Sequence, residues 1–432
     1  MTQETKTLNK GQQAATDGFF QFLFSNDREL NISGPGGVGK TFLMGYWIDE
    51  IMPRYEHTCQ LMGLHPEYSN VQMTATTNKA VDVLSHSTGR PAETAHSFFN
   101  LKVKDNYATG RSEITKSNSW VVHQNTIIFI DECSMIDRQL LAFIREGTSK
   151  CKIVYVGDHC QLAPVHEPIS PIYNQNLPFF ELTEPMRTGC PHLQNLNLQM
   201  RHTVETGEFY PIQLVPGVIE HLDSGQMEAK IDEVFLNGLA DARILAYTNR
   251  RVTDYNNHVR AIRQINSTYV EGECLVNNSA VTLRTCMLSV EEEVTISNLS
   301  LLTEMVEIEA DVFLECRRAT LTTDYHGSYD DVMLPEDKAH FNQLVKHYQQ
   351  QKRWPMYYKL KNNFPDLRPR DAATVHKSQG SSHDYVFIDL GDISTCHNPN
   401  QAARMLYVAV SRARHGIYFY GELASKYGGL VK

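Results

Sequence analysis

Residues 33–42, SGPGGVGKTF, decide the fold class of this 432-residue chain. The stretch from Gly34 to Thr41 fits the pattern G-x-x-x-x-G-K-[ST]. Residues 29–33 before it are a short apolar run that predicts a strand, and residues 41–52 after it have apolar residues at helical spacing. A strand, a glycine loop and a helix in this order predict a phosphate-binding loop in an α/β domain.

The glycines of this loop allow backbone N–H groups to turn toward phosphate oxygens, and the helix N-terminus adds partial positive charge. We expect Lys40 to reach the β- and γ-phosphates of ATP and Thr41 to place its hydroxyl on Mg²⁺. The alternative interpretation is a chance glycine turn before a helix. The predicted nucleotide-binding residues are Gly36, Gly37, Val38, Gly39, Lys40 and Thr41.

Composition limits the class of protein. No apolar run approaches the ~20 residues that span a bilayer, and the polar N-terminus, MTQETKTLNK, has no apolar signal segment. The nine cysteines include no C-x-x-C pair, which argues against a zinc module and a disulfide framework. We therefore expect a cytoplasmic protein without a membrane partner. The net charge of −10 means that nucleic-acid binding would need a local basic groove.

Two further apolar runs end in polar residues of the type that a nucleotide site needs. Residues 127–130 are all apolar and are followed by Asp131 and Glu132, which predicts a strand buried in a parallel sheet. We expect Asp131 to hold Mg²⁺ and Glu132 to activate the attacking water. Gln161 follows another apolar run, residues 153–156, and is a candidate sensor of the γ-phosphate. Gln12 precedes a predicted helix, and its amide can pair with adenine.

The order of these motifs along the chain resembles that of the superfamily 1 helicases, within them the RecD-like branch and the phage Dda-type helicases. The motifs are Gln12, GPGGVGKT (34–41), TATTNKAVDVL (74–84), DECSM (131–135), GDHCQLAPV (157–165), LTEPMRT (182–188), VHKSQG (375–380) and YVAVSRAR (407–414). The resemblance spans Leu8 to about Tyr420 and is weak near residues 264–365.

The resemblance implies an α/β fold with two RecA-like P-loop motor domains and ATP at their interface. It implies Arg187 and Arg412 as arginines that contact the γ-phosphate, one at the domain junction and one from the second domain. An arginine fork of this kind stabilises charge on the transferred phosphoryl group. Gly380 matches a position whose backbone lies near the nucleotide. Catalytic residues are therefore expected to be Lys40, Asp131, Glu132, Gln161, Arg187 and Arg412.

Polar strand ends predict the path of a single nucleic-acid strand. In the first half these are Thr74, Thr76, Thr77 and Asn78, followed by His96 and Ser97 in a motif that resembles the family's next one. Thr77 and Asn78 also suit a helix N-cap, which is compatible with strand contact. In the second half the candidates are Thr248, Asn249, Thr374, His376 and Lys377.

Two segments interrupt the α/β pattern. Residues 100–120 alternate around a glycine turn and predict a β-hairpin, which in the family is a pin that parts the duplex. Tyr107, Phe98 and Phe99 are candidate wedge aromatics, although core packing is expected for at least one phenylalanine. Residues 264–365 contain short β-rich runs, for which the family implies an inserted small SH3-like β-rich domain.

The resulting prediction is an ATP-dependent DNA helicase, with ATP and Mg²⁺ as cofactors. The family implies 5′→3′ movement on single-stranded DNA, unwinding of forked or tailed duplexes in replication or recombination, a monomer, and a single-strand-binding or other replication protein as a further partner. The alternatives are an RNA helicase or RNP-remodelling ATPase, a P-loop phosphotransferase, and a non-enzymatic ATP-binding module. Predicted domains are 1–185, 186–263 with 366–432, and the insertion 264–365.

Overall fold

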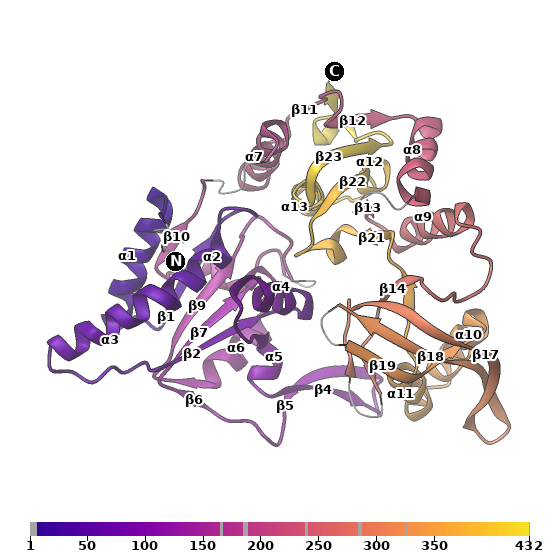
Figure 1. The fold of residues 1–432 in the computed structure, drawn as a ribbon, viewed down its shortest axis with the longest axis horizontal. Helices are drawn as coiled ribbons and strands as arrows, with labels where there is room; N and C mark the ends of the chain where they lie inside the picture. Colours follow the sequence, from indigo (N-terminus) through magenta and orange to yellow (C-terminus); the bar gives the residue numbers. More distant parts are fainter. Residues whose placement is uncertain are drawn as a thin grey trace, which may run out of the picture.

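A computed structural model describes residues 7–164, 167–184, 189–237, 241–283, 287–324 and 327–431 of the chain. Figure 1 shows two α/β units side by side, with a β-rich unit below the second one. We call these the first unit, the second unit and the inserted unit.

The first unit is a parallel sheet with helices on both faces. Within the described residues its strand order is β10-β1-β9-β7-β2-β3, and all neighbouring strands are parallel. Alternate residues of one strand face opposite cores: Ile127 and Phe129 pack with helices α1 and α3, whereas Ile128 and Ile130 pack with α6. Burial on both faces explains the unbroken apolar run before Asp131.

The bounds of the first unit's main elements follow in chain order. They are α1 (Lys10–Phe24), β1 (Glu29–Ser33), α2 (Lys40–Tyr46), a π-helical turn (Trp47–Ile51), α3 (Met52–Leu61), β2 (Asn70–Ala75), α4 (Asn78–Thr88), β3 (Glu93–Thr94), α5 (Ala95–Phe98), β4 (Leu101–Asn106), β5 (Arg111–Lys116), β6 (His123–Gln124), β7 (Thr126–Asp131), α6 (Arg138–Glu146), β8 (Thr148–Ser149), β9 (Lys152–Gly157) and β10 (Phe179–Glu181). The strands β4 and β5 form an antiparallel hairpin, which confirms the hairpin predicted for residues 100–120.

The second unit repeats the parallel arrangement with the strand order β12-β23-β22-β13-β21 in the described part of the chain. Its elements are α7 (Pro191–Thr206), β11 (Ile212–Gln213), β12 (Ile219–Leu222), α8 (Ser224–Asn237), β13 (Ala242–Ala246), α9 (Asn249–Ile262), β21 (Ala372–Thr374), β22 (His383–Asp389), α12 (Leu390–Ile393), α13 (Pro399–Val410), β23 (Ala413–Tyr420) and β24 (Leu430–Val431). Helices α7 and α13 pack against one face of the sheet, and α8 and α9 against the other. The two parallel sheets are consistent with two RecA-like domains.

The inserted unit is an antiparallel sheet of the order β19-β18-β17-β14-β20, as far as its residues are described. Its elements are β14 (Cys274–Asn277), β15 (Val281–Thr282), β16 (Met287–Leu288), β17 (Glu293–Glu309), β18 (Val312–Thr323), β19 (Gly327–Pro335), α10 (Lys338–Gln350), α11 (Trp354–Asn363) and β20 (Leu367–Pro369). The sequence correctly predicted an insertion here, but the expected SH3-like barrel is not confirmed. Strands β17 and β18 form a long hairpin whose pairing shifts register after Ile296 and Leu299.

A half-buried carboxylate joins all three units. Glu293 of β17 lies 3.4 Å from the ammonium of Lys79 in α4 and 2.8 Å from the guanidinium of Arg370, which precedes β21. Arg243 of β13 approaches the same carboxylate at 3.9 Å. Burial lowers the pKa of Lys79, while the charge of Glu293 opposes that shift. This ion cluster therefore fixes where the inserted unit meets the other two.

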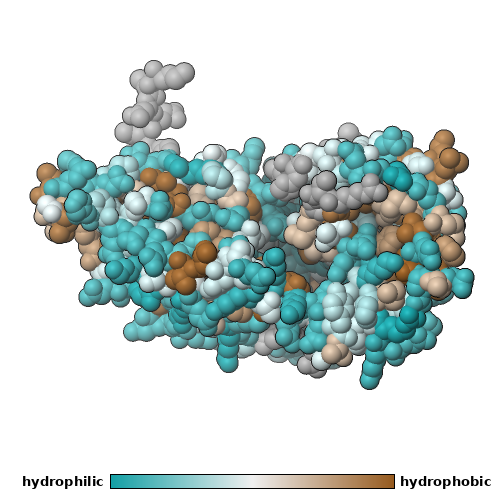
Figure 2. Space-filling model, turned by 90° about the horizontal axis from the view of Figure 1, so that it is seen from below, coloured by the Kyte–Doolittle hydropathy of each residue, from teal (hydrophilic) through white to brown (hydrophobic). Residues whose placement is uncertain are grey.

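The surface seen from below is mostly hydrophilic, with apolar groups in scattered patches, and it is hollowed between the left and right halves (Figure 2). Among the described helices, none combines the length and the apolar character required to cross a bilayer.

Candidate active site

The glycine loop lies at the carboxyl end of β1 and leads directly into α2. Gly37 and Gly39 have φ values of 85° and 81°, a region that side chains other than glycine disfavour. At Gly34 an added Cβ would lie 2.4 Å from the carbonyl oxygen of Leu182, so the neighbouring chain also requires glycine. The Lys40 ammonium donates to the carbonyls of Gly34 (2.6 Å) and Pro35 (3.0 Å), so it lies over its own loop.

Gln12 ties the first helix to this loop. It is fully buried and forms a capping box with Asn9, in which each side chain bonds the other's backbone N–H. The Gln12 amide nitrogen also donates to the carbonyl of Val38 at 3.2 Å. Gln12 therefore lies beside the phosphate loop, and both polar atoms of its amide have partners within the protein.

Asp131 and Glu132 follow the buried strand β7. Burial raises the pKa of the Asp131 carboxyl to about 6; the charge of Glu132 adds to this shift, and the charge of Lys40 opposes it. The Asp131 carboxylate accepts a hydrogen bond from the backbone N–H of Glu132 at 2.8 Å. Glu132 has a φ of 51°, which is uncommon for a residue other than glycine and is typical of functional sites under local strain.

The second unit approaches Glu132 from the other side. Gly380 has a φ of 80°, and a Cβ added there would lie 4.0 Å from Glu132 Oε1. Gln379 donates from its amide to the Ser134 hydroxyl at 3.1 Å, which links the two units directly. The Glu132 Oε2 atom is buried and has no hydrogen-bond partner among the described residues. Loops from both units thus converge at Glu132.

Arg412 lies in the same region and is 5% exposed. Its guanidinium donates to the carbonyls of Val408 (3.1 Å) and Ser381 (2.8 Å), so it caps helix α13 and supports the Gly380 turn. Burial lowers the pKa of Arg412, and the negative charge of Glu132 is the largest effect that opposes this shift. The site therefore combines buried charges from both units.

Gln161 and Arg187 complete the set of predicted catalytic residues. Gln161 is 5% exposed, and its side-chain oxygen has no hydrogen-bond partner within the described residues. It lies in the loop after β9, next to β1 and β7 in the sheet. Arg187 lies outside the described residues.

The candidate strand contacts of the first unit differ in position. Thr77 is exposed and caps α4 by accepting the backbone N–H of Ala80, and Asn78 begins that helix. The Thr76 hydroxyl donates to the carbonyl of Glu132 at 3.0 Å, so Thr76 supports the hydrolytic site. Thr74 is fully buried and donates to the carbonyl of Phe129. The Thr74 side chain therefore does not reach the surface, and the prediction of Thr74 as a direct contact is wrong.

His96 and Ser97 lie in the short helix α5, where Ser97 is exposed. Burial lowers the pKa of His96, and the charge of Asp137 opposes that shift. Phe99 is fully buried in the core under β4, which matches the expectation that one of the two phenylalanines packs internally.

The second unit presents its candidate contacts at two strand ends. Asn249 is exposed at the start of α9, whereas the Thr248 hydroxyl donates to Asp392 at 2.9 Å. Thr374 is 7% exposed and accepts the backbone N–H of Lys377, so its hydroxyl has an internal partner.

His376 and Lys377 follow in the next turn. Burial lowers the pKa of His376, whose ring lies 6.4 Å from that of Tyr247. The Lys377 ammonium pairs with Glu291 of the inserted unit at 2.5 Å and also bonds Asn278. It is therefore already neutralised in part by the inserted unit.

The hairpin β4–β5 packs on helix α11 of the inserted unit. Tyr107, at the tip, is 57% exposed and makes an edge-to-face contact with Tyr358, with ring centroids 5.5 Å apart. The Asn362 amide donates to Asp105 at 2.9 Å. An added Cβ at Gly110 would lie 2.3 Å from the Trp354 ring, so the tip fits closely against that side chain.

Comparisons with known proteins place these motifs in a family. A family model described as an AAA domain matches residues 7–210, and one described as a UvrD-like helicase C-terminal domain matches residues 371–420. The ATP-dependent DNA helicase Dda of Enterobacteria phage T4 is 24% identical over 462 residues, which cover 95% of this chain and 99% of that protein. The chain is a superfamily 1 helicase of the RecD and Dda type. It is thus an ATP-dependent DNA helicase, as its motifs predicted.

Two further proteins are similar to this chain. An uncharacterized protein of Acanthamoeba polyphaga mimivirus is 21% identical over 96% of this chain and 100% of that protein. The crystal structure of a Bacteroides Pif1 helicase, in complex with ADP-AlF3 and single-stranded DNA, covers 99% of this helicase and 95% of that chain, with a TM-score of 0.52 and 14% identity. The last likeness concerns the fold alone.

Sequence reasoning missed the side chains that hold the loop of Gln161. They are Arg201 of α7 and Arg404 and Tyr407 of α13 in this helicase. The only signal in the sequence was the position of Arg404 and Tyr407 on the helix that ends two residues before Arg412.

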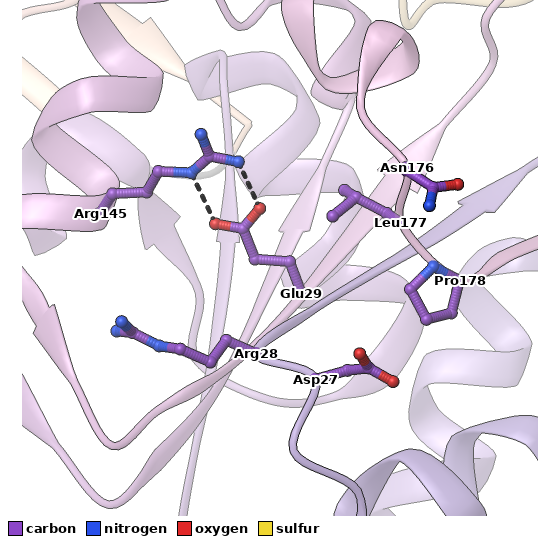
Figure 3. A pocket seen from close by; sticks show the side chains of 7 residues that line it. All are labelled: Asp27, Arg28, Glu29, Arg145, Asn176, Leu177 and Pro178. Atoms are coloured by element: carbon purple, nitrogen blue, oxygen red, sulfur yellow. Dashed lines mark hydrogen bonds and ion pairs between the residues drawn. The ribbon is translucent and has the colours of Figure 1, made fainter.

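A separate depression lies at the opposite end of β1 from the glycine loop (Figure 3). There Arg145 donates to both oxygens of Glu29, at 2.7 and 2.6 Å, and Arg145 also bonds Gln175. Ligands of parallel sheets bind at the carboxyl ends of strands. This ion pair therefore supports the sheet and is not part of the nucleotide site.

Proposed function

We propose that this helicase couples ATP hydrolysis to 5′→3′ movement along single-stranded DNA and that it unwinds tailed or forked duplexes. The observation that carries the coupling is the position of Glu132. It lies between Lys40 and Asp131 of the first unit and Gly380 and Arg412 of the second. A site completed by two units links hydrolysis to their relative movement. The polarity rests on the resemblance to Dda-type helicases.

ATP would bind with its phosphates on the loop 34–41 and its base near Gln12, where the loop and helix α1 are joined. The donor set fits Mg²⁺, since a carboxylate and a hydroxyl oxygen are ligands that this hard cation prefers. Asp131 and Thr41 would hold the ion, and a cation there would offset the cost of burying the Asp131 carboxylate. When bound, Mg²⁺ neutralises charge on the β- and γ-phosphate oxygens.

The protein's own residues would supply the remaining chemistry. Glu132 accepts the proton of the attacking water, and its unpartnered oxygen is available for that bond. Lys40, Arg187 and Arg412 offset the charge on the transferred phosphoryl group. The Gln161 amide contacts the γ-phosphate and loses that contact after hydrolysis.

The DNA strand would cross both units at the polar ends of their strands. Thr77, Asn78 and Ser97 are candidate contacts on the first unit, with Thr76 and His96 beside them. Asn249, Thr248, His376 and Lys377 are candidates on the second unit. Two DNA-binding surfaces that move relative to each other would advance the protein along one DNA strand.

The hairpin β4–β5 would act as the pin that separates the strands. Its packing against α11 supports this role, because a wedge must resist the fork. The exposed Tyr107 can stack on an opened base, worth about 1–3 kcal/mol. Deletion of the tip would therefore impair unwinding more than movement.

We propose the domain division 1–185, 186–263 with 366–432, and 264–365. The two parallel sheets and the antiparallel insertion support it, although β20 extends the inserted sheet to Pro369. We further propose a role in replication or recombination, with a single-strand-binding or other replication protein as partner, and action as a monomer.

The test is ATP hydrolysis with no nucleic acid, with single-stranded DNA and with RNA, followed by unwinding of duplexes that carry a 5′ or a 3′ tail. We expect strong stimulation by DNA and unwinding of the 5′-tailed duplex alone. Greater stimulation by RNA would contradict the DNA substrate. Unwinding of the 3′-tailed duplex alone would contradict the polarity.

A further inference from the structure

The loop after β9, residues 158–161, is held by side chains of the second unit. The Asp158 carboxylate is fully buried and accepts from the Arg201 guanidinium at 2.6 Å and from the Tyr407 hydroxyl at 2.6 Å. Arg201 belongs to α7 and Tyr407 to α13, two helices that pack side by side on the second sheet (Figure 1). A carboxylate of one unit is thus shared by two donors of the other.

The Arg404 side chain holds the same loop through two backbone carbonyls of that loop. Its guanidinium donates to the carbonyl of His159 at 2.6 Å and to that of Gln161 at 2.5 Å. Asn400, one turn earlier in α13, orients it by accepting from Nε at 2.9 Å. Burial lowers the pKa of Arg404, and the charges of Cys160 and Asp158 oppose that shift. We call Arg404 and Tyr407 of α13 the clasp; Arg201 of α7 bonds the same loop.

Burial of the Asp158 carboxylate and the Arg404 guanidinium costs desolvation free energy, which stability alone would not require. A buried arginine that bonds carbonyls is held less strongly than one that bonds a carboxylate. Separation of the two units would leave the Asp158 carboxylate and the backbone carbonyls without these donors. The contacts of the clasp therefore tie the loop of the first unit to the second unit.

The clasp lies on the helix that also positions Arg412. Arg404 and Arg412 are eight residues apart, about 12 Å along a helix that ends at Val410. Arg412 bonds the carbonyl of Val408 in its last turn. One rigid helix thus contacts the Gln161 loop at one point and presents Arg412 beside Glu132 at its end.

The residue held in this way has a free functional group. Gln161 is 5% exposed, and its side-chain oxygen has no partner among the residues that the structure describes. Its backbone, by contrast, is fixed on both sides, by the turn to Asp158 (3.1 Å) and by Arg404. A fixed backbone with an unpartnered side-chain oxygen suits a side chain that accepts a hydrogen bond from a bound water while its amide NH2 group donates to a phosphate oxygen.

We propose that Arg404 and Tyr407 are positioning residues for hydrolysis, which hold the Asp158–Gln161 loop so that Gln161 and Arg412 reach the nucleotide in the same closing movement. The inference rests on the proposed role of Gln161 at the γ-phosphate. Helix α13 thereby links Gln161 of the first unit to Arg412 of the second unit.

The first experiment compares Tyr407→Phe and Arg404→Lys with a matched control, Tyr255→Phe. Tyr255 is a buried tyrosine of the second unit whose hydroxyl donates to Asp389 at 2.8 Å, and Asp389 also pairs with an arginine. kcat and KM for ATP are measured at saturating single-stranded DNA, together with the melting temperature. Both clasp variants should lose about tenfold in kcat with KM changed less than about twofold. The control should keep its kcat at a similar loss of melting temperature.

The second experiment combines Arg404→Lys with Gln161→Ala in a double-mutant cycle. If Arg404 acts through Gln161, Arg404→Lys should lower kcat by less than about twofold once the glutamine side chain is absent. A full tenfold further loss in that background would overturn the inference alone, as would an equal kcat loss in Tyr255→Phe. A Gln161→Ala variant with wild-type kcat would overturn the proposed role of Gln161 and the inference with it.

Discussion

At the scale of single residues, the site concentrates charges that a folded protein ordinarily avoids burying. Asp131 has a pKa raised to about 6 by burial, Arg412 has a lowered one, and Glu132 has an oxygen without a partner in the described structure. Each of these features costs stability. They are compatible with a site that is completed by the charges of a nucleotide and a cation.

Glu132→Gln should separate binding of ATP from its hydrolysis. The amide keeps the shape of the side chain but cannot accept a proton, so turnover should fall by about 10²–10⁴-fold. ATP affinity, measured by titration of a fluorescent analogue, should change little. Lys40→Ala is the informative comparison, since it should weaken binding itself. Near-normal turnover in Glu132→Gln would remove Glu132 from the role of base.

The sequence predicted those site residues whose neighbours are close along the chain. The loop 34–41 is one such case, because its glycines, lysine and threonine act through local backbone geometry. Thr76 and Arg404 were not predicted as supports of the site, because their partners lie 56 and about 245 residues away. The sequence predicts Thr74 as a nucleic-acid contact because a polar residue at the end of a β-strand gives the same pattern whether its hydroxyl faces the solvent or a buried carbonyl.

At the scale of elements, the hairpin β4–β5 and helix α11 form a pair. The tip residue Gly110 has a φ of 70° and lies against Trp354, while Asp105 bonds Asn362. The sequence located this hairpin through its alternation and glycine turn. It could not identify what supports the hairpin, because α11 follows about 250 residues later.

Gly110→Ala should displace the pin from its support. The added Cβ would overlap the Trp354 ring, and we expect unwinding of a 5′-tailed duplex to fall about tenfold, the equivalent of one base-pair step at about 1.4 kcal/mol. DNA-stimulated ATPase should stay within about twofold. Gly63→Ala is a matched control, since Gly63 has a φ of 69° with nothing within 4 Å of an added Cβ. Equal loss of ATPase and unwinding would assign the hairpin to the fold.

A polar contact within the second unit should give stability a defined pH dependence. Burial would raise the pKa of Asp241, but the hydrogen bond from His383 and the charges of His383, Arg370 and Arg414 lower it to about 2. A lowered carboxyl pKa contributes stability above about pH 4, and that contribution is lost as the pH falls toward 2.

Asp241→Asn should therefore cost about 1–2 kcal/mol at neutral pH, after allowance for the partial exposure of the carboxylate. Urea unfolding at several pH values measures this cost. The difference between wild type and variant should shrink as the pH falls from 4 toward 2, because the carboxyl is protonated in that range. A difference that grows over that range would contradict the assigned ion pairs.

In the inserted unit, the predicted helices and strands are not sufficient to predict how the strands pair. Its β-rich runs and its two helices follow from alternation and helical spacing, yet the barrel implied by the family resemblance is not confirmed. Whether strands close into a barrel or remain an open sheet depends on pairing and register. Here β17 and β18 pair along a long hairpin with shifts after Ile296 and Leu299, which no local pattern of residues specifies.

At the scale of the whole molecule, contacts between units carry the function. Glu293 joins the inserted unit to Lys79 and Arg370, the clasp joins α13 to the loop after β9, and Gln379 bonds Ser134 beside the nucleotide site. Membership of superfamily 1 was predictable because the motifs are read in order along the chain. The contacts between the units were not, because each joins residues far apart in sequence.

The measurement that tests this account most directly is ATP hydrolysis by wild type and Arg412→Ala, with and without single-stranded DNA. The variant should fold and bind DNA, as shown by its melting temperature and by fluorescence anisotropy, yet lose DNA-stimulated hydrolysis by ~10³-fold or more. Arg412→Lys should restore little, because a point charge does not reproduce the guanidinium fork. Wild-type hydrolysis by Arg412→Ala in the presence of DNA would contradict an active site built from both units.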